Sequence, residues 1–241
     1  IKKMPISSKM SYLIAIGTSV CGATAIVATA PVINAKKSEV AYAIANITLF
    51  GVIAMIIYPY FAEWYFDNDA LKIGLFLGTS IHETSQVAAA GLIYDQQFNS
   101  PETLNVATVT KLIRNTFLVI LIPLFAILYN RGQLKNQKYS ILSIFPYFVI
   151  GFIGMIIFRN IGDQFFIPDG NAYIIWIKLI EYFKTLATVF LTMAMAAVGI
   201  SINLNELKSM GYKPFIIGFI AAVTVGFISL IYIEIISKFF I

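Results

Sequence analysis

A histidine and a glutamate stand together in the middle of an apolar stretch. His82 and Glu83 interrupt the run Ile73–Tyr94, about ten residues from either end. A charged group at that depth in a bilayer costs several kcal/mol, so it is usually paired or lines a cavity. His82 is the only histidine of the chain and can change charge near neutral pH. The pair can therefore carry a proton or an ion. The alternative is a structural role in which a cation such as Lys111 holds Glu83.

The same residues are similar to part of a zinc motif. Within His82-Glu83-Thr84-Ser85-Gln86, Gln86 takes the place of the second histidine of HExxH. A catalytic zinc needs three protein ligands, and the chain has no second histidine and only one cysteine, Cys21. We therefore expect no metal, no cofactor and no enzymatic activity. If the segment stays helical, Gln86 and Thr79 lie one turn from the pair and extend a polar face.

Two cationic side chains lie three positions apart in another apolar segment. Lys111 and Arg114 share one face of a predicted helix, one to two turns from its outer end. A guanidinium can hold an oxyanion through two parallel hydrogen bonds, so the pair is a candidate anion clamp. The alternative is that both side chains reach the membrane interface. With His82 they make three potential cations against the single acid Glu83, which favours an anionic substrate.

A weak internal repeat contains small and hydroxyl-bearing residues. Gly17–Ala30 aligns without gaps on Gly78–Gly91, with four identical positions of fourteen. Such segments either pack tightly against neighbouring helices or form interrupted helices that hold a substrate in mid-membrane. We favour broken or re-entrant helices over 11–34 and 73–94, one entering from each side, as is common in secondary transporters. Their hydroxyl groups would come from Thr18, Ser19, Thr79 and Ser80.

The composition is typical of an integral membrane protein. Of 241 residues, 59% are hydrophobic and 12% are charged, about half the usual charged share. A water-soluble domain of this size could not bury so much apolar surface. The charge-free runs are too long for barrel strands, so we predict an all-α polytopic bundle, a single transmembrane domain over 1–241. Besides the two broken segments, spans are predicted at about 40–61, 106–129, 140–158, 185–204 and 214–236.

Lysine and arginine are unevenly distributed between the predicted connections. With hairpins at the two broken segments, ten of these residues lie on the side of the N-terminus and three on the other. If both segments cross the membrane fully, nine of these residues lie on the side of the N-terminus and four on the other. Because cytoplasmic loops are rich in lysine and arginine, we predict a cytoplasmic N-terminus and an outside C-terminus. The choice between hairpins and crossings stays open on this count.

Several runs are typical of a known family. Four of them occur in the family's order along nearly the whole chain: GTSVCGATAIVATAPVI, EVAYAIANITLFGVIAM, GTSIHETSQVAAAG and TKLIRN. The chain thereby resembles the YeiH-like family of uncharacterised bacterial membrane proteins, which bears the label of sulfate exporters. The resemblance implies a multi-pass transporter of the bacterial plasma membrane. It also implies further N-terminal helices, so that this chain, which begins at Ile1, would be the C-terminal part of a longer transporter.

Together, these patterns predict a secondary transporter of a small anion, sulfate or a related sulfur oxyanion, coupled to a proton or another ion. The alternatives are a cation/proton antiporter and a passive channel. Expected partners are the lipid bilayer, the anion and a coupling proton or cation; a homo-oligomer is compatible with the sequence, and no nucleic acid is expected. The predicted substrate and ion pathway consists of Thr18, Ser19, Thr79, Ser80, His82, Glu83, Gln86, Lys111 and Arg114.

Cysteine labelling tests this topology. In a Cys21→Ser background, a cysteine replacing Gln133 should react with a membrane-impermeant reagent from the cytoplasm, and one replacing Asn99 from outside, because of the lysine and arginine bias. Cysteines at Ser38 and Asn68 separate the two alternatives: Ser38 inside and Asn68 outside indicates hairpins, and the reverse indicates crossings. Reaction of the Gln133 and Asn99 positions from the same side would contradict the orientation.

Overall fold

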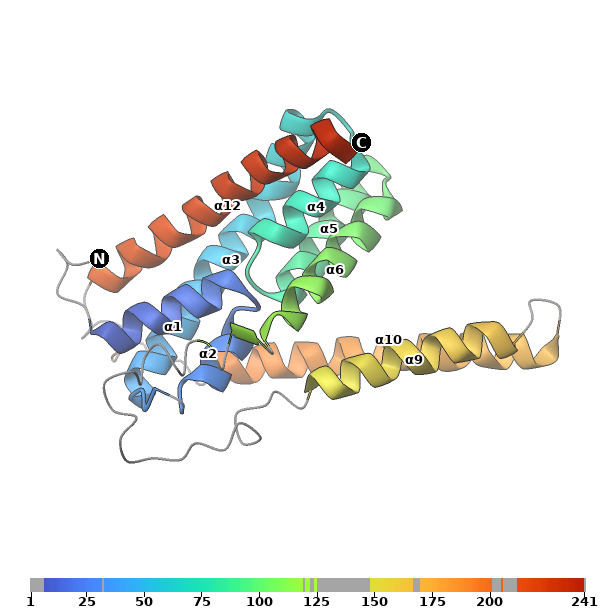
Figure 1. Ribbon diagram of the computed structural model, residues 1–241, viewed down its shortest axis with the longest axis horizontal. Coiled ribbons are helices and arrows are strands. Elements are labelled where there is room, and N and C mark those ends of the chain that lie inside the picture. Colours follow the sequence, from blue (N-terminus) through green and yellow to red (C-terminus); the bar gives the residue numbers. More distant parts are fainter. Residues whose placement is uncertain are drawn as a thin grey trace. The chain divides into compact units, whose positions relative to one another are not determined.

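The computed structural model describes residues 7–31, 33–118, 120–121, 124, 148–166, 170–200, 205 and 212–240. All regular secondary structure in these residues is helical (Figure 1), which confirms the predicted all-α class for this part of the chain. The chain divides into two units. The first comprises Ile1–Ile144 and Ile202–Ile241, and the second comprises Phe145–Ser201.

The first unit is a bundle in which α6 packs against both α4 and α5, and α3 packs against α1, α5 and α12. Figure 1 shows the long helices α3 and α12 running side by side. The described helices of this unit are α1 (Ser8–Ser19), α2 (Ala23–Thr29), α3 (Lys37–Phe66), α4 (Ala70–Ser80), α5 (Thr84–Phe98), α6 (Pro101–Thr116) and α12 (Lys213–Phe240).

Two described helices, α3 and α12, are long and apolar enough to cross a membrane. Their apolar lengths are 30 residues (Lys37–Phe66) and 27 residues (Lys213–Phe239). At 1.5 Å per residue each is about 40 Å or longer, more than the roughly 30 Å of the hydrocarbon core. The predicted spans at 40–61 and 214–236 lie inside these two helices.

Local signals place several helix ends. The Ser7 hydroxyl accepts the Met10 N–H at 3.1 Å, and the Asp69 carboxylate accepts the Lys72 N–H at 3.0 Å, so both residues cap the helices that follow them. At the C-terminal end of α3, Asp67 adopts a left-handed conformation (φ 50°), which ends the helix before the short turn to α4.

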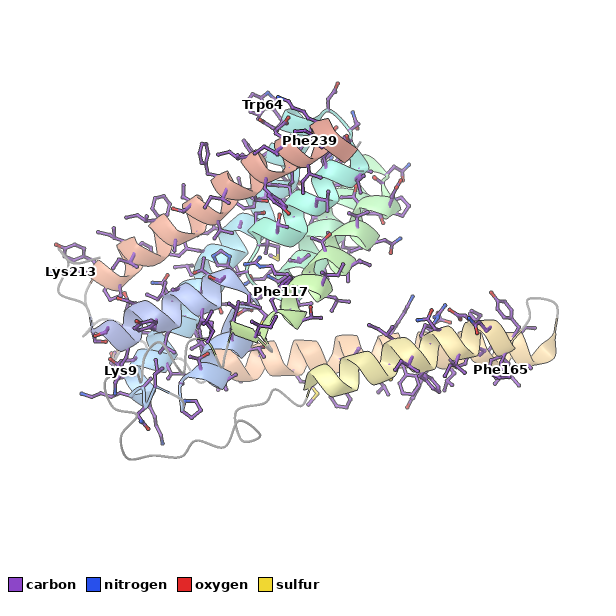
Figure 2. The ribbon with its side chains drawn as sticks, in the orientation of Figure 1. Lys9, Trp64, Phe117, Phe165, Lys213 and Phe239 are labelled. Atoms are coloured by element: carbon purple, nitrogen blue, oxygen red, sulfur yellow. The ribbon has the colours of Figure 1, made fainter. Side chains whose placement is uncertain are left out.

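The segment α1–α2 begins and ends at the same end of the bundle. The Lys9 ammonium donates to the Asn34 carbonyl at 2.5 Å, and the Ser7 hydroxyl donates to the Glu39 carboxylate at 2.5 Å. These bonds hold the start of α1 beside the start of α3. In Figure 2, Lys9 and Lys213 lie at one end of this unit, opposite Trp64 and Phe239. The first small-residue segment is therefore a hairpin.

The segment α4–α5 is a second hairpin, which enters from the opposite end. The Thr103 hydroxyl at the start of α6 donates to the Ala70 carbonyl at 3.4 Å, beside the start of α4. Near the end of α5, the Tyr94 hydroxyl donates to the Glu63 carboxylate at 2.5 Å, close to the end of α3. Both ends of this segment thus lie at the Trp64 end of the bundle, so the two hairpins have opposite orientations.

Two buried amide side chains lie against glycines of neighbouring helices. A Cβ added to Gly218 of α12 would stand 1.8 Å from Asn46 Oδ1, and one added to Gly51 of α3 would stand 1.9 Å from Gln86 Oε1. Asn46 Nδ2 also donates to the Pro214 carbonyl at 2.7 Å. Because any larger residue would collide with these amides, the two glycines permit α3 to approach α12 and α5 closely.

The second unit contains α9 (Phe148–Phe165) and α10 (Asn171–Ile200). Asp163 joins them, because its Oδ1 accepts the Trp176 indole N–H at 2.8 Å while its Oδ2 accepts Arg159 Nε at 2.6 Å. Gly162 leaves room for the ring, since a Cβ there would lie 2.0 Å from Trp176. Both hydrogen bonds hold the pKa of Asp163 below its usual range, with that from Trp176 the larger cause.

Parts of three predicted spans lie outside the described residues. Of the span at 106–129, α6 covers the portion up to Thr116, and residues 119, 122–123 and 125–129 are not described. The span at 140–158 is described from residue 148, where α9 begins, and the span at 185–204 is described up to residue 200, where α10 ends.

The Asp163–Trp176 bond gives a testable pH dependence. In a Trp64→Phe variant, Trp176 is the one remaining tryptophan. Asp163 follows the predicted span, and its pKa is lowered in the folded chain. The ionised carboxylate therefore stabilises the folded chain fully above the unfolded-state pKa, and this contribution is lost as the pH falls through the folded-state pKa. Trp176 fluorescence should therefore change with a midpoint below about 3.9, the ordinary aspartate value.

The control for this titration is Asp163→Asn in the same background, which retains a side-chain acceptor but does not titrate. Its Trp176 emission should stay constant over the same pH range. A midpoint at or above the ordinary aspartate value, or the same transition in the Asn variant, would contradict the assignment.

Candidate functional site

Both hairpins are interrupted at equivalent positions of the repeat. Helix α1 ends at Ser19 and α2 begins at Ala23, while α4 ends at Ser80 and α5 begins at Thr84. Three residues are unwound in each case: 20–22 in the first break and 81–83 in the second. The repeat alignment pairs residue 20 with 81 and residue 22 with 83. The weak repeat therefore corresponds to two half-helix pairs broken at the same point.

Lys111 of α6 joins the two breaks. Its side chain is fully buried, with 0% of its surface exposed. Its Nζ donates to the Val20 carbonyl and to the Ile81 carbonyl, each at 2.8 Å. Val20 and Ile81 are equivalent positions of the repeat. One ammonium group thus supplies a donor to the same backbone oxygen in both copies.

Arg114, one turn further along α6, contacts the carbonyls at the ends of α1 and α4. These carbonyls have no intrahelical partner and carry the negative end of each helix dipole, so a cation stabilises them. Four of the five guanidinium N–H groups are used in this way. Nη2 donates to Thr18 (2.5 Å), Nε to Ser19 (2.9 Å), and Nη1 to Thr79 (2.7 Å) and Ile81 (3.2 Å).

Glu83 occupies the opposite pole of the breaks, where α2 and α5 begin. It is the residue before the first turn of α5, and its Oε1 accepts the Ala23 N–H at the start of α2 at 3.3 Å. The Thr48 hydroxyl of α3 donates to the same oxygen at 3.2 Å. The other oxygen, Oε2, is buried and has no hydrogen-bond partner among the described residues. A carboxylate therefore stands where two helices present their positive ends.

Gly22 makes room for that carboxylate. Its backbone has φ 65° and ψ −124°, a conformation essentially restricted to glycine. A Cβ at this position would lie 2.4 Å from Glu83 Cγ. The two equivalent positions of the repeat are thus complementary: one carries the acid, and the other has no side chain.

His82 and Gln86 are also buried, with 2% and 4% of their surfaces exposed. Gln86 Nε2 donates to the Thr48 carbonyl at 3.1 Å, which fixes the amide with Oε1 toward Gly51. His82 Nδ1 and Gln86 Oε1 lack a hydrogen-bond partner among the described residues. The second break and the first turn of α5 thus contribute three buried polar atoms that lack a hydrogen-bond partner among the described residues, counting Glu83 Oε2.

The hydroxyl groups predicted to lie on the substrate pathway form hydrogen bonds within their own helices. Each bonds to a backbone carbonyl of its own helix, one turn back. These side chains are Thr18 (to Ile14, 2.7 Å), Ser19 (to Ala15, 2.6 Å), Thr79 (to Leu75, 2.6 Å) and Ser80 (to Phe76, 2.5 Å). Three of the four residues reach the cationic centre through their carbonyls instead. The predicted anion clamp likewise donates to backbone, so a bidentate grip by Arg114 would require exchange of a carbonyl bond.

Sequence reasoning missed several residues of this site. Thr48 holds Glu83 and Gln86, Ser229 of α12 is hydrogen bonded to Thr79, and Asn115 Nδ2 donates to the Thr84 hydroxyl at 3.0 Å. The available signal was a polar side chain within an apolar run, such as Thr48 inside 40–61. Such a residue is visible in the sequence, but the neighbour it faces is not.

Comparison with known proteins identifies the family. A family model described as "Conserved hypothetical protein 698" matches residues 1–218. A UPF0324 membrane protein of Fusobacterium nucleatum is 36% identical over 235 residues, covering 95% of this chain and 67% of that protein. A UPF0324 membrane protein of Streptococcus agalactiae is 35% identical over 217 residues, covering 90% of this chain and 62% of that protein. The chain belongs to the UPF0324 membrane protein family.

This membership confirms the resemblance drawn from the sequence runs. The UPF0324 chain spans about two thirds of the length of these relatives, 67% of one and 62% of the other. The relatives are named membrane proteins, and α3 and α12 are apolar enough to cross a bilayer, so a membrane location is supported. No solved structure matches the chain.

Replacing Lys111 tests whether it holds the breaks together. In Lys111→Met, the Val20 carbonyl loses the donor that Lys111 supplies, and the Ile81 carbonyl keeps only the longer bond from Arg114 Nη1 at 3.2 Å. A buried acceptor left unpaired costs about 1–3 kcal/mol, so thermal unfolding of this UPF0324 chain in detergent should occur at a clearly lower temperature.

The matched control is Lys72→Met. Lys72 is partly exposed and pairs with Asp69 at 3.4 Å, an interaction worth about 1 kcal/mol at most. Its unfolding temperature should remain close to that of the unaltered chain. Equal decreases in the two variants would show that Lys111 has no special role at the breaks.

Proposed function

We propose that this protein is a secondary transporter of a small anion. The observation that carries the proposal is the convergence of two oppositely oriented, interrupted hairpins on Lys111 and Arg114. Interrupted helices that meet inside a membrane protein and arise from inverted repeats are a recurrent architecture of transporter binding sites. In this arrangement the backbone N–H and C=O groups at the breaks can form hydrogen bonds with other parts of the protein and are not exposed to lipid.

The charges at the breaks favour an anion. The two helix C-termini carry about −0.5 charge each and the two N-termini about +0.5 each, so these contributions largely cancel. The formal charges are two cations, Lys111 and Arg114, against the one carboxylate of Glu83. A positive charge remains even with Glu83 ionised, and a small anion would neutralise it. A second cation beside this pair would be repelled.

The N–H groups of Lys111 and Arg114 that the backbone carbonyls leave unused are the proposed donors to the anion. Lys111 uses two of its three N–H groups on carbonyls, and Arg114 uses four of its five. One N–H of each side chain therefore stays available for a substrate oxygen without breaking a carbonyl bond. Sulfate and related sulfur oxyanions have several acceptor oxygens and suit a site built from such donors.

Ligand screening tests the proposal against its alternatives. Sulfate, thiosulfate and phosphate should raise the unfolding temperature of the purified full chain, and exchange of sodium for potassium as their counter-ion should leave that increase unchanged, because the unpaired charge is positive. In proteoliposomes, labelled anion should show saturable counterflow, which a passive channel does not. Stabilisation by cations alone would favour a cation/proton antiporter and contradict the anion proposal.

Arg114→Lys tests the contribution of the guanidinium. The substitution keeps the charge but loses the planar fork, so anion affinity should fall about tenfold, the equivalent of one charge-assisted hydrogen bond. Arg159→Lys is the matched control, because Arg159 lies in the second unit and pairs with Asp163. Size-exclusion profiles and circular dichroism establish that both variants fold. Unchanged affinity in a folded Arg114→Lys variant would remove Arg114 from the anion site.

A further inference from the structure

Glu83 has an unused oxygen in a buried position. The residue is 3% exposed, and its Oε1 already accepts two hydrogen bonds, from Ala23 and Thr48. Its Oε2 has no partner in the part of the chain that the structure describes. Burying an ionised carboxylate oxygen without a hydrogen-bond donor costs more free energy than burying an unpaired neutral polar group. The site therefore provides one position at which a proton would bind.

The groups around Glu83 come from four directions. The first break contributes Cys21, and the second contributes His82, beside Glu83 in the chain. Helix α6 contributes Lys111, which interacts electrostatically with Glu83, and Arg114. Helix α3 contributes the uncharged Thr48. Among these groups Glu83 is the one acid, so it is the resident counter-charge of the two cations.

We propose that Glu83 acts as an internal anion that competes with the transported anion, and that protonation of its Oε2 is the coupling step of transport. This inference rests on the proposed anion transport. While Glu83 is ionised, its charge offsets part of the positive potential of Lys111, Arg114 and the α5 N-terminus. Protonation removes that negative charge without moving a side chain, and the positive potential becomes available to the substrate.

The proton and the anion then travel in the same direction. A proton from water on one side forms an O–H bond with Oε2, the anion binds, and both are released on the other side, where the O–H bond breaks and the proton returns to water. Because the two equilibria are linked, anion binding and proton binding strengthen each other by the same factor. The protein is thereby a proton–anion symporter, a class that neither the family description nor the relatives' names give.

Glu83→Gln isolates the coupling step, since the amide has the shape of the protonated acid and cannot titrate. We measure binding of radiolabelled sulfate and thiosulfate, which are anions of strong acids and stay fully ionised over the pH range in which carboxylic acid side chains and histidine titrate. In the unaltered chain, affinity should decrease as pH rises, by up to about tenfold per pH unit where Glu83 loses its proton. In Glu83→Gln, affinity should be high and independent of pH.

Transport gives a second readout. In proteoliposomes, an inward proton gradient should drive accumulation of sulfate by the unaltered chain. Glu83→Gln should lose this accumulation and keep exchange of sulfate for sulfate, because exchange needs no net proton movement. Loss of exchange in a variant that folds and binds sulfate normally would overturn the assignment, since it would place Glu83 in the translocation step itself.

Glu63→Gln is the matched control. Glu63 accepts the Tyr94 hydroxyl near the C-terminal end of α3, away from the breaks, and glutamine retains an acceptor for that bond. This variant should keep the pH dependence of the unaltered chain. A flat pH profile in His82→Gln together with a retained profile in Glu83→Gln would overturn the proposal, because the coupling proton would then belong to His82.

The outcome also separates this inference from the proposed function. Binding of sulfate or thiosulfate that does not vary with pH in the unaltered chain would overturn the role of Glu83 and leave anion transport intact. Absence of binding of both anions at every pH would overturn both.

Discussion

Helices that end inside a membrane protein leave carbonyl groups without intrahelical donors. The need to supply hydrogen bonds to these carbonyls determines how the first unit is organised. The carbonyls at the ends of α1 and α4 receive their hydrogen bonds from Lys111 and Arg114. In an apolar environment an unpaired carbonyl has no water to bond, so the breaks are stable only with these donors. The positive charge has a second effect, because two negative helix ends would otherwise repel each other. This need explains why two side chains of α6, Lys111 and Arg114, contact both breaks.

The opposite side of the breaks uses the opposite charge. Glu83 stands at the start of α5 and accepts the first N–H of α2, so a carboxylate faces two positive helix ends. The first copy of the repeat contributes Gly22, whose backbone conformation and missing side chain make space for the Glu83 side chain. The repeat is therefore symmetric in its backbone and asymmetric in its chemistry. One acid serves both copies, as do the two cations.

Close packing against α3 and α12 completes the arrangement. Gln86 lies on Gly51 and Asn46 lies on Gly218, in each case with an oxygen where a Cβ would have to be. Thr48 bonds to both Glu83 and Gln86 and so ties the second break to α3. Helix α3 thus contacts the polar centre through one short stretch of an otherwise apolar sequence. In the UPF0324 chain, the site depends on this stretch as much as on the charged residues.

The sequence by itself determined the class of protein and the residues of interest. Low charge and long apolar runs are sufficient to predict a helical membrane protein. A segment that crosses the hydrocarbon core must satisfy its own backbone hydrogen bonds, and runs of this length do so as helices. The repeat identified both interrupted segments, and His82, Glu83, Lys111 and Arg114 stood out because ionisable groups are costly in apolar surroundings. The family resemblance also followed from the sequence runs.

The tertiary structure decided the roles of those residues. The sequence gives hydroxyls at Thr18 and Thr79 but does not show that their carbonyls, rather than their side chains, meet Arg114. It does not show that Thr48 faces Glu83, because these residues are 35 positions apart and their contact depends on how two helices are rotated. Hydrophobic pattern defines which segments lie in the membrane. Only packing between segments defines which backbone oxygen lies next to which cation, and that determined the site.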